Sequence, residues 1–125
     1  MEMGKGDITG SVIGCAIEVH RQLGPGLLES AYKQCLAHEL GRKGIGFEVE
    51  WALPVRYKGL ALECGYRIDL LVERHLIVEL KSVKHILAIH KAQLLTYMNL
   101  AQVPLGLLIN FNTVLLKQGI SRLIR

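Results

Sequence analysis

Two apolar stretches separated by a short polar link constrain the fold of this chain more than any other feature. Leu60–Leu71 and Leu76–Val83 are rich in β-favouring residues, and the polar tripeptide Glu73–His75 lies between them. A link of that length joins antiparallel neighbours, so we predict a β-hairpin. Charged residues interrupt both strands, and buried charges need compensating partners. The hairpin is therefore where we expect a functional site.

The charged residues of this hairpin have a spacing that places them together. With the turn centred near Arg74, Asp69 lies opposite Glu79 across the ladder, and opposed side chains share one face. Lys81 follows Glu79 by two residues, so strand alternation puts it on the same face. Two close carboxylates repel unless a cation neutralises them, and Mg²⁺ (or Mn²⁺) takes such oxygen ligands. A bound metal and an ammonium suit phosphodiester hydrolysis.

The same spacing also fits an ordinary strand face. In that interpretation Glu79 and Lys81 are solvated, and Asp69 is only a cross-strand partner of little energetic weight. An Asp followed by Glu-x-Lys is a weak motif, so spacing alone leaves both interpretations open.

The remaining chain predicts one α/β (α+β) domain that spans residues 1–125. Apolar residues at helical spacing predict three helices, over 8–23, 27–40 and about 86–101. Asp7 or Thr9 is the expected cap of the first helix. Besides the hairpin we expect strands over 47–51, 55–57 and 105–111, and a final strand within 114–124. Pro54 predicts an edge, bulge or bend, and Lys58-Gly59 predicts a turn. The order α-α-β-β-β-α-β, with one further strand at the end, favours a mixed sheet flanked by helices.

Composition and charge indicate a folded domain with a mild excess of positive charge. Of the 125 residues, 50% are hydrophobic and 21% are charged, which is typical of a folded domain and not of a disordered chain. The net charge of +4 favours a polyanionic partner such as nucleic acid only mildly. The three scattered cysteines predict reduced core residues: Cys15, Cys35 and Cys64. With no membrane-length apolar run and no leader pattern at the start of the chain, we expect no membrane contact and a cytoplasmic location.

Several segments resemble one known family. Gly26–Tyr32 has the pattern Gly-x-x-Glu-x-x-Tyr, the signature of the GxxExxY family of small bacterial and archaeal proteins, which is placed in the PD-(D/E)XK nuclease superfamily. Four other segments are similar to that family, so the resemblance covers nearly the whole chain: Glu18–Gly26, Tyr66–Val72, Val78–Lys81 and Gly106–Phe111. It implies a restriction-endonuclease-like core. Ile68 stands where the nominal superfamily motif has proline, a departure that divergent members share.

The resemblance also implies roles for individual residues. Asp69 and Glu79 match the metal ligands, and Lys81 matches the lysine that acts on the scissile phosphate or the attacking water. Glu29 matches an acidic residue that often completes such sites, so the implied metal ligands are Glu29, Asp69 and Glu79. An i, i+4 ion pair with Lys33 is the structural alternative for Glu29.

The third predicted helix carries a polar stripe. His90, Gln93 and Tyr97 fall within about 60° of one another on a helical wheel. Nucleases of the RecB-like type often carry a Gln and a Tyr beside the metal centre, which implies a catalytic role for Gln93 and a possible one for Tyr97. The alternative is the polar edge of a packed helix.

These observations predict a Mg²⁺- or Mn²⁺-dependent endo- or exonuclease that acts on nucleic acid, with DNA as the leading candidate. One alternative is a module that binds nucleic acid or protein with the nuclease fold but without catalysis. Another is a hydrolase of small phosphate esters, which the basic charge disfavours. A homodimer is one arrangement that would give so small a domain enough surface to grip a duplex.

Overall fold

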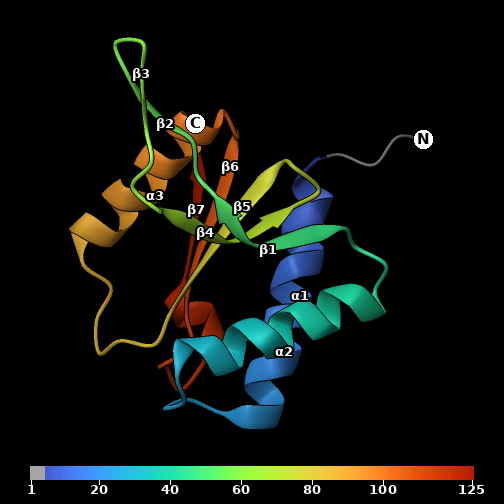
Figure 1. The fold of residues 1–125 in the computed structure, drawn as a ribbon. Coiled ribbons are helices and arrows are strands. Elements are labelled where there is room, and N and C mark those ends of the chain that lie inside the picture. The colour runs from blue at the N-terminus through green and yellow to red at the C-terminus, as the bar shows by residue number, and fades with distance from the viewer. Residues whose placement is uncertain (1–4) are drawn as a thin grey trace.

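A five-stranded mixed sheet forms the centre of the computed structural model, which describes residues 5–125 (Figure 1). Its strands, in order across the sheet, are β1 (Phe47–Ala52), β4 (Arg67–Val72), β5 (Leu76–Lys81), β6 (Leu105–Asn110) and β7 (Ile120–Ile124). β5 and β6 pair in parallel, and the other neighbours are antiparallel. The parallel pair requires a crossover connection, which a helix supplies.

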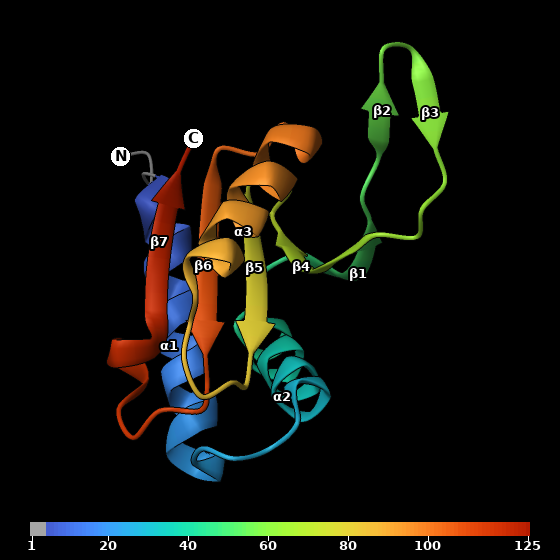
Figure 2. The same cartoon turned by 90° about the vertical axis from the view of Figure 1, so that its left-hand side faces the viewer.

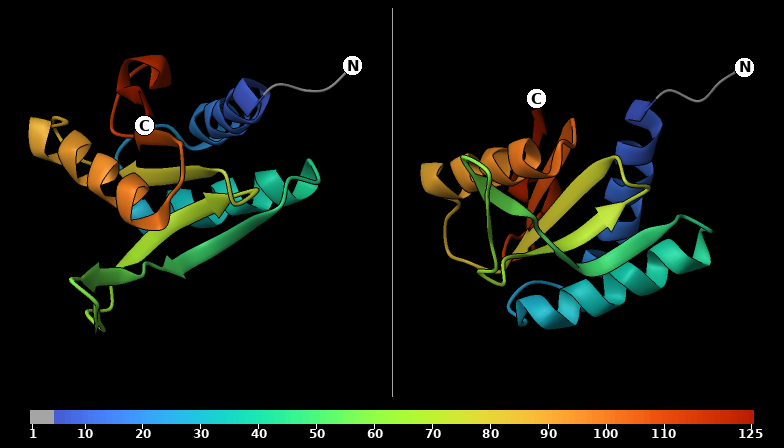
Figure 3. Two further views of the ribbon diagram at one scale, coloured as in Figure 1. Left: turned by 90° about the horizontal axis from the view of Figure 1, so that it is seen from above. Right: turned by 45° about the horizontal axis from the view of Figure 1, so that its top comes forward.

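Helices cover both faces of this sheet. They are α1 (Lys5–Leu23), α2 (Glu29–Arg42) and the crossover helix α3 (Ala88–Ala101). α1 and α2 lie on one face and α3 lies on the other (Figure 3, left). Alternate residues of β5 enter the two cores, because Leu76, Val78 and Leu80 pack with α1 and α2 whereas Ile77 packs with α3. Glu79 and Lys81 therefore belong to the face that α3 covers.

The predicted strand Leu60–Leu71 is wrong as a single element. The chain forms β3 (Leu60–Leu62), leaves the β conformation, and re-enters it at β4. β3 pairs only with β2 (Val55–Tyr57), so the two form a separate hairpin between β1 and β4, which pair directly with each other. The expected meander is interrupted by an inserted arm, which projects from the body of the molecule in Figure 2.

The turn signals around this arm are confirmed. Pro54 lies in the break between β1 and β2, as its missing amide donor predicts. Lys58 and Gly59 form the tip of the hairpin with φ of 48° and 85°, which are the positive values that a tight two-residue turn requires.

The first helix begins earlier than its apolar pattern predicts. α1 starts at Lys5 and not at Ile8, so Asp7 and Thr9 lie within the helix and the prediction that one of them caps it is wrong. Apolar periodicity detects only helical turns that contain apolar residues, and Lys5, Gly6 and Asp7 provide none. We also expected no leader at the start of the chain. Residues 1–4, on which that prediction rests in part, lie outside the part of the chain that the structure describes.

Three other expectations have clear outcomes. The last predicted strand is shorter, because a 3₁₀ turn at Leu116–Gly119 precedes β7. All three cysteines are free, but Cys64 is exposed on the arm's return segment, so the prediction that it belongs to the core is wrong. Within residues 5–125, no helix combines the length and hydropathy that crossing a membrane requires.

Tyr32 fixes the corner between α1 and α2. Its side chain is buried, and its ring stacks on Phe111 with 4.3 Å between centroids. The hydroxyl donates to the Gly24 carbonyl at 2.6 Å and accepts from the Leu27 amide at 3.1 Å. The tyrosine of the Gly-x-x-Glu-x-x-Tyr pattern therefore holds the loop that precedes Glu29.

Replacing Tyr32 with Phe will lower the free energy of unfolding by about 1–3 kcal/mol, because a half-buried amide and carbonyl lose their partner. Urea denaturation measures the change. Tyr57→Phe is the matched control, since Tyr57 is 61% exposed. Equal stability of Tyr32→Phe and wild type would contradict this role of the hydroxyl.

Candidate metal and catalytic site

Asp69 and Glu79 lie where the regular backbone pairing of β4 with β5 ends. Beyond that point, hydrogen bonds from backbone amides to the two carboxylates replace it. The ladder pairs Val72 with Leu76 and Leu70 with Val78, and the next step of this register sets Asp69 opposite Glu79. There the Asp69 amide donates to Glu79 Oε2 at 2.8 Å, and the Leu80 amide donates to Asp69 Oδ2 at 2.8 Å. Each carboxylate is thus held by a strand amide, and the predicted register of the hairpin is confirmed.

The environment of Glu79 disfavours its negative charge. Only 9% of the residue is exposed. Burial, followed by the adjacent charge of Asp69, raises the pKa of Glu79 to about 8. The hydrogen bond from the Asp69 amide and the charges of Lys81 and Lys33 act in the opposite direction without cancelling this effect. Near neutral pH the pair therefore favours either a proton or a cation.

The donor set fits a hard divalent cation. The strand amides bind Asp69 Oδ2 and Glu79 Oε2, so each carboxylate has a second oxygen that no strand amide binds, and Asp69 Oδ1 contacts only the Lys33 ammonium, at 3.5 Å. Among the side chains of residues 8–125, no group of three or more His, Cys, Asp or Glu is arranged to hold a metal ion. Two carboxylate oxygens suit Mg²⁺ or Mn²⁺, because Mg²⁺ usually keeps several waters and takes one or two protein carboxylates.

Lys33 and Glu50 border the carboxylates, and sequence reasoning missed this contact. The Lys33 ammonium lies 3.5 Å from Asp69 Oδ1 and donates to the carboxylate of Glu50. Burial opposes this charge, but Glu50 and Asp69 raise the pKa of Lys33 above its ordinary value. The ion pairs of Lys33 are thus with these two residues, and the structure records no Glu29–Lys33 pair between side chains it describes.

Glu50 reaches Lys33 through an unusual backbone conformation. Its φ is 55°, which is uncommon for a residue other than glycine. The neighbours Val49 and Trp51 keep the regular pairing of β1 with β4, so the distortion is confined to the residue beside Asp69. Such local strain clusters at functional sites. No sequence signal points to it.

Lys81 lies at the end of β5 on the face shared with Glu79. It is half-buried, and it pairs in register with Asn110 of β6. The Asn110 side chain is buried, accepts from the Val83 amide at 3.0 Å and donates to the Val83 carbonyl at 2.9 Å. These two hydrogen bonds of the Asn110 side chain fix the segment that follows Lys81. Sequence reasoning did not find Asn110.

α3 brings Tyr97 near the carboxylates. Burial, followed by the charge of Glu79, raises the pKa of Tyr97, and Tyr66 and Asp69 add to the shift. Gln93 is exposed on the same helix. His90 has a structural role, because its Nδ1 accepts from the Leu87 amide at 3.0 Å and caps the start of α3.

The structure does not bring Glu29 into contact with the pair. Glu29 is exposed at the first residue of α2, and no hydrogen bond or ion pair between described residues joins it to Asp69 or Glu79. Its implied role as a ligand stays a prediction.

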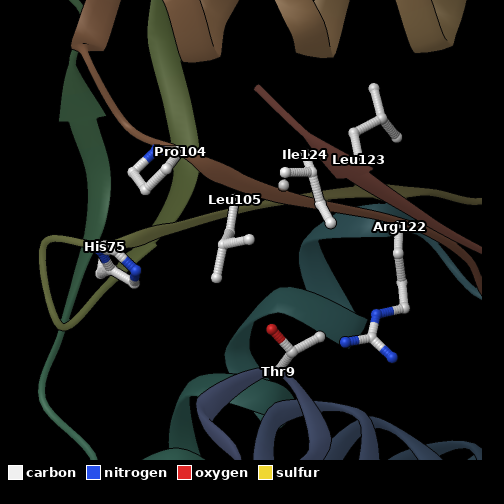
Figure 4. A pocket seen from close by; sticks show the side chains of 8 residues that line it. Thr9, His75, Pro104, Leu105, Arg122, Leu123 and Ile124 are labelled. Carbon is white, nitrogen blue, oxygen red and sulfur yellow. The ribbon is translucent and has the colours of Figure 1, made fainter. Parts of the chain in front are cut away.

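A separate pocket of about 350 Å³ lies away from these residues (Figure 4). Leu105 lines it, and Leu105 pairs with Leu76 at the turn end of β5, whereas Glu79 and Lys81 lie toward the other end. The lining is mostly apolar and contains no carboxylate: Thr9, His75, Pro104, Leu105, Gly106, Arg122, Leu123 and Ile124. This pocket therefore offers none of the carboxylate oxygens that Asp69 and Glu79 supply at the β4–β5 hairpin.

The sequence was compared with models of known protein families. Residues 6–123 match the family model described as the PD-(D/E)XK nuclease superfamily. Neither the curated proteins nor the solved structures contain a significant match. The five-stranded mixed sheet with helices on both faces is consistent with the restriction-endonuclease-like fold, so the predicted fold class is confirmed.

In the absence of metal, stability should fall as the pH rises from about 4.5 to about 8. Over that interval the folded protein keeps a proton on Glu79 that the unfolded chain releases, so each pH unit costs up to about 1.4 kcal/mol. Glu79→Gln removes the ionisation and should flatten this slope. Urea denaturation in chelator across the interval measures both proteins, and equal slopes would contradict the burial of an ionisable carboxyl at this site.

Proposed function

Because the chain belongs to the PD-(D/E)XK nuclease superfamily, we propose that it is a metal-dependent nuclease that hydrolyses phosphodiester bonds of nucleic acid, with DNA as the preferred substrate. The observation that carries the proposal is the pairing of half-buried Asp69 with buried Glu79, each held by a strand amide, beside Lys81 on the face of Glu79. Carboxylates in a site of low dielectric favour a cation, and the nearby ammonium favours an anionic substrate.

Each residue has a proposed role. Asp69 and Glu79 would hold Mg²⁺ or Mn²⁺, with Glu29 as a third proposed ligand. When bound, such an ion supplies Lewis-acid stabilisation of phosphoryl oxygens and an ionised water near neutral pH. Lys81 places a positive charge where negative charge develops on the scissile phosphate. Gln93 and Tyr97 contribute polar groups from α3, on the same side of the sheet.

We also propose that the chain is a GxxExxY protein. The motif residues have separate positions at the α1–α2 corner, where Gly26 takes a φ of 96°, Glu29 starts α2 and Tyr32 binds the loop. Only glycine adopts that φ readily, which accounts for the first residue of the pattern.

The contact of Lys33 with Asp69 favours a second candidate function. An internal ammonium 3.5 Å from Asp69 Oδ1 already offsets part of the negative charge. A domain that keeps this ion pair and takes no metal would be a noncatalytic module that binds nucleic acid or protein.

Cleavage assays separate the two candidates. The purified protein is incubated with single-stranded, duplex and branched DNA and with RNA, in Mg²⁺, Mn²⁺ or chelator. We expect metal-dependent cleavage that falls roughly 100-fold or more in Lys81→Ala, because the variant loses a charge that stabilises the transition state. Asp69→Asn should lose activity because the metal loses a ligand.

Lys84→Ala is the matched control, since Lys84 is exposed beyond the end of β5 and should leave cleavage unchanged. Absence of cleavage by folded wild type, with nucleic-acid binding equal in Asp69→Asn, would overturn the nuclease and support the noncatalytic module.

A further inference from the structure

The β2–β3 arm, residues 53–66, has few backbone interactions that would stabilise it. Its strands are three residues long and pair only with each other. An isolated hairpin of this size gains little stability in water. Leu53 and Val55 at its base pack against the core under α3, but the arm then extends away from the sheet (Figure 2), and residues 56–66 are exposed.

The two faces of this arm differ in character. Cross-strand pairing joins Val55 to Leu62 and Tyr57 to Leu60, so these four side chains share an apolar face. Tyr57 is 61% exposed and Leu60 is 59% exposed. A flat apolar surface with an aromatic ring at its outer end suits a ligand that contains planar rings, because these can stack on it.

Positive charge lies on the other face and at the tip of the arm, because Arg56 pairs with Ala61 and Lys58 lies in the turn. Arg56 and Lys58 are exposed, and no ion pair within residues 8–125 joins either to a carboxylate. The Lys58 ammonium lies 5.4 Å from the centroid of the Tyr57 ring. The outer half of the arm therefore combines a ring with two cations that no carboxylate neutralises.

The arm rises from the rim of the carboxylate site. The Leu53 amide donates to the Tyr66 carbonyl at 2.9 Å and closes the base of the arm. β4 begins at Arg67, directly after the arm, and Asp69 is the third residue of that strand. A polymer that reaches the carboxylates thus lies within reach of the arm.

We propose that the β2–β3 arm binds single-stranded nucleic acid, with bases stacked on Tyr57 and the adjoining apolar face and with phosphates at Arg56 and Lys58. Aromatic side chains beside unpaired cations are the usual means of binding single strands, because every base has a face to stack and every nucleotide a charge. The inference deepens the proposed nuclease function and rests on it for the choice of substrate.

A second copy of the chain is a poorer occupant of the same surface. A stable protein interface needs about 800 Å² on each partner, which four side chains on three-residue strands do not provide. The centres of protein interfaces are also depleted in charge, whereas Arg56 lies on one of these strands and Lys58 lies at the tip.

The test is the affinity for a fluorescein-labelled oligothymidylate, measured by anisotropy with the full chain in chelator so that cleavage does not interfere. Tyr57→Ala should weaken binding about 10-fold, since stacking on one aromatic ring contributes roughly 1–3 kcal/mol per base. The double variant Arg56→Ala/Lys58→Ala should weaken binding and reduce the slope of log affinity against log salt by about 1.4. Arg122→Ala, on the opposite edge of the sheet, is the control for loss of a charge.

Unchanged affinity in both arm variants would overturn the proposal. So would an effect confined to duplex DNA, or light scattering that shows a wild-type dimer which Tyr57→Ala dissociates. Circular dichroism of each variant establishes that the domain is folded.

A small phosphodiester, bis(p-nitrophenyl) phosphate, separates this inference from the nuclease function, because it is too short to span the arm and the metal site. Weaker strand binding by the arm variants without Mn²⁺-dependent hydrolysis by wild type would support the arm and overturn the nuclease. If wild type hydrolyses this substrate, Lys81→Ala does not, and the arm variants bind the strand as well as wild type, the nuclease is supported and the proposal for the arm is overturned.

Discussion

The rest of the structure depends on two carboxylates that replace backbone carbonyls as hydrogen-bond acceptors in the β4–β5 ladder. Asp69 and Glu79 each accept a hydrogen bond from a strand amide, so these two amides have partners although the regular pairing of β4 with β5 stops at Leu70 and Val78. Two acidic groups this close in a buried place carry a free-energy cost that ordinary packing does not offset. The arrangement is favourable only with a proton, an ammonium or a metal ion between or beside them, and the surrounding elements supply positive charge accordingly.

The architecture explains how distant parts of the chain reach this point. α2 brings Lys33 to Asp69, the distorted residue Glu50 of β1 holds that lysine, and α3 sets Tyr97 near both carboxylates. The parallel neighbour β6 contributes Asn110, which orders the chain after Lys81. A sheet with its functional hairpin at the centre allows groups from both faces and both neighbouring strands to converge.

Part of this site follows from the sequence because short-range rules govern it. A three-residue turn and strand alternation were enough to place Asp69 opposite Glu79 and to put Lys81 on their face. The contact between Lys33 and Glu50 was not predictable, since it joins a helix to a strand across the fold and requires a φ of 55° at a glutamate. The inserted arm was also missed, because Leu60–Leu62 has the composition of a strand whether it continues into β4 or ends and pairs with β2. Local pattern indicates which segments are extended, but tertiary pairing decides which partner each one takes.

The most direct test of the central claim is Mn²⁺ binding by isothermal titration calorimetry, followed in wild type, Asp69→Asn and Glu79→Gln. Glu48→Gln is the control, because Glu48 is a half-buried carboxylate of β1 that pairs with Arg74. If Asp69 and Glu79 form the metal site, wild type and the control will bind Mn²⁺ with equal affinity, and each site variant will bind at least 10-fold more weakly because one carboxylate ligand is lost. Equal Mn²⁺ affinity in all four proteins, or no binding by folded wild type, would contradict the assignment.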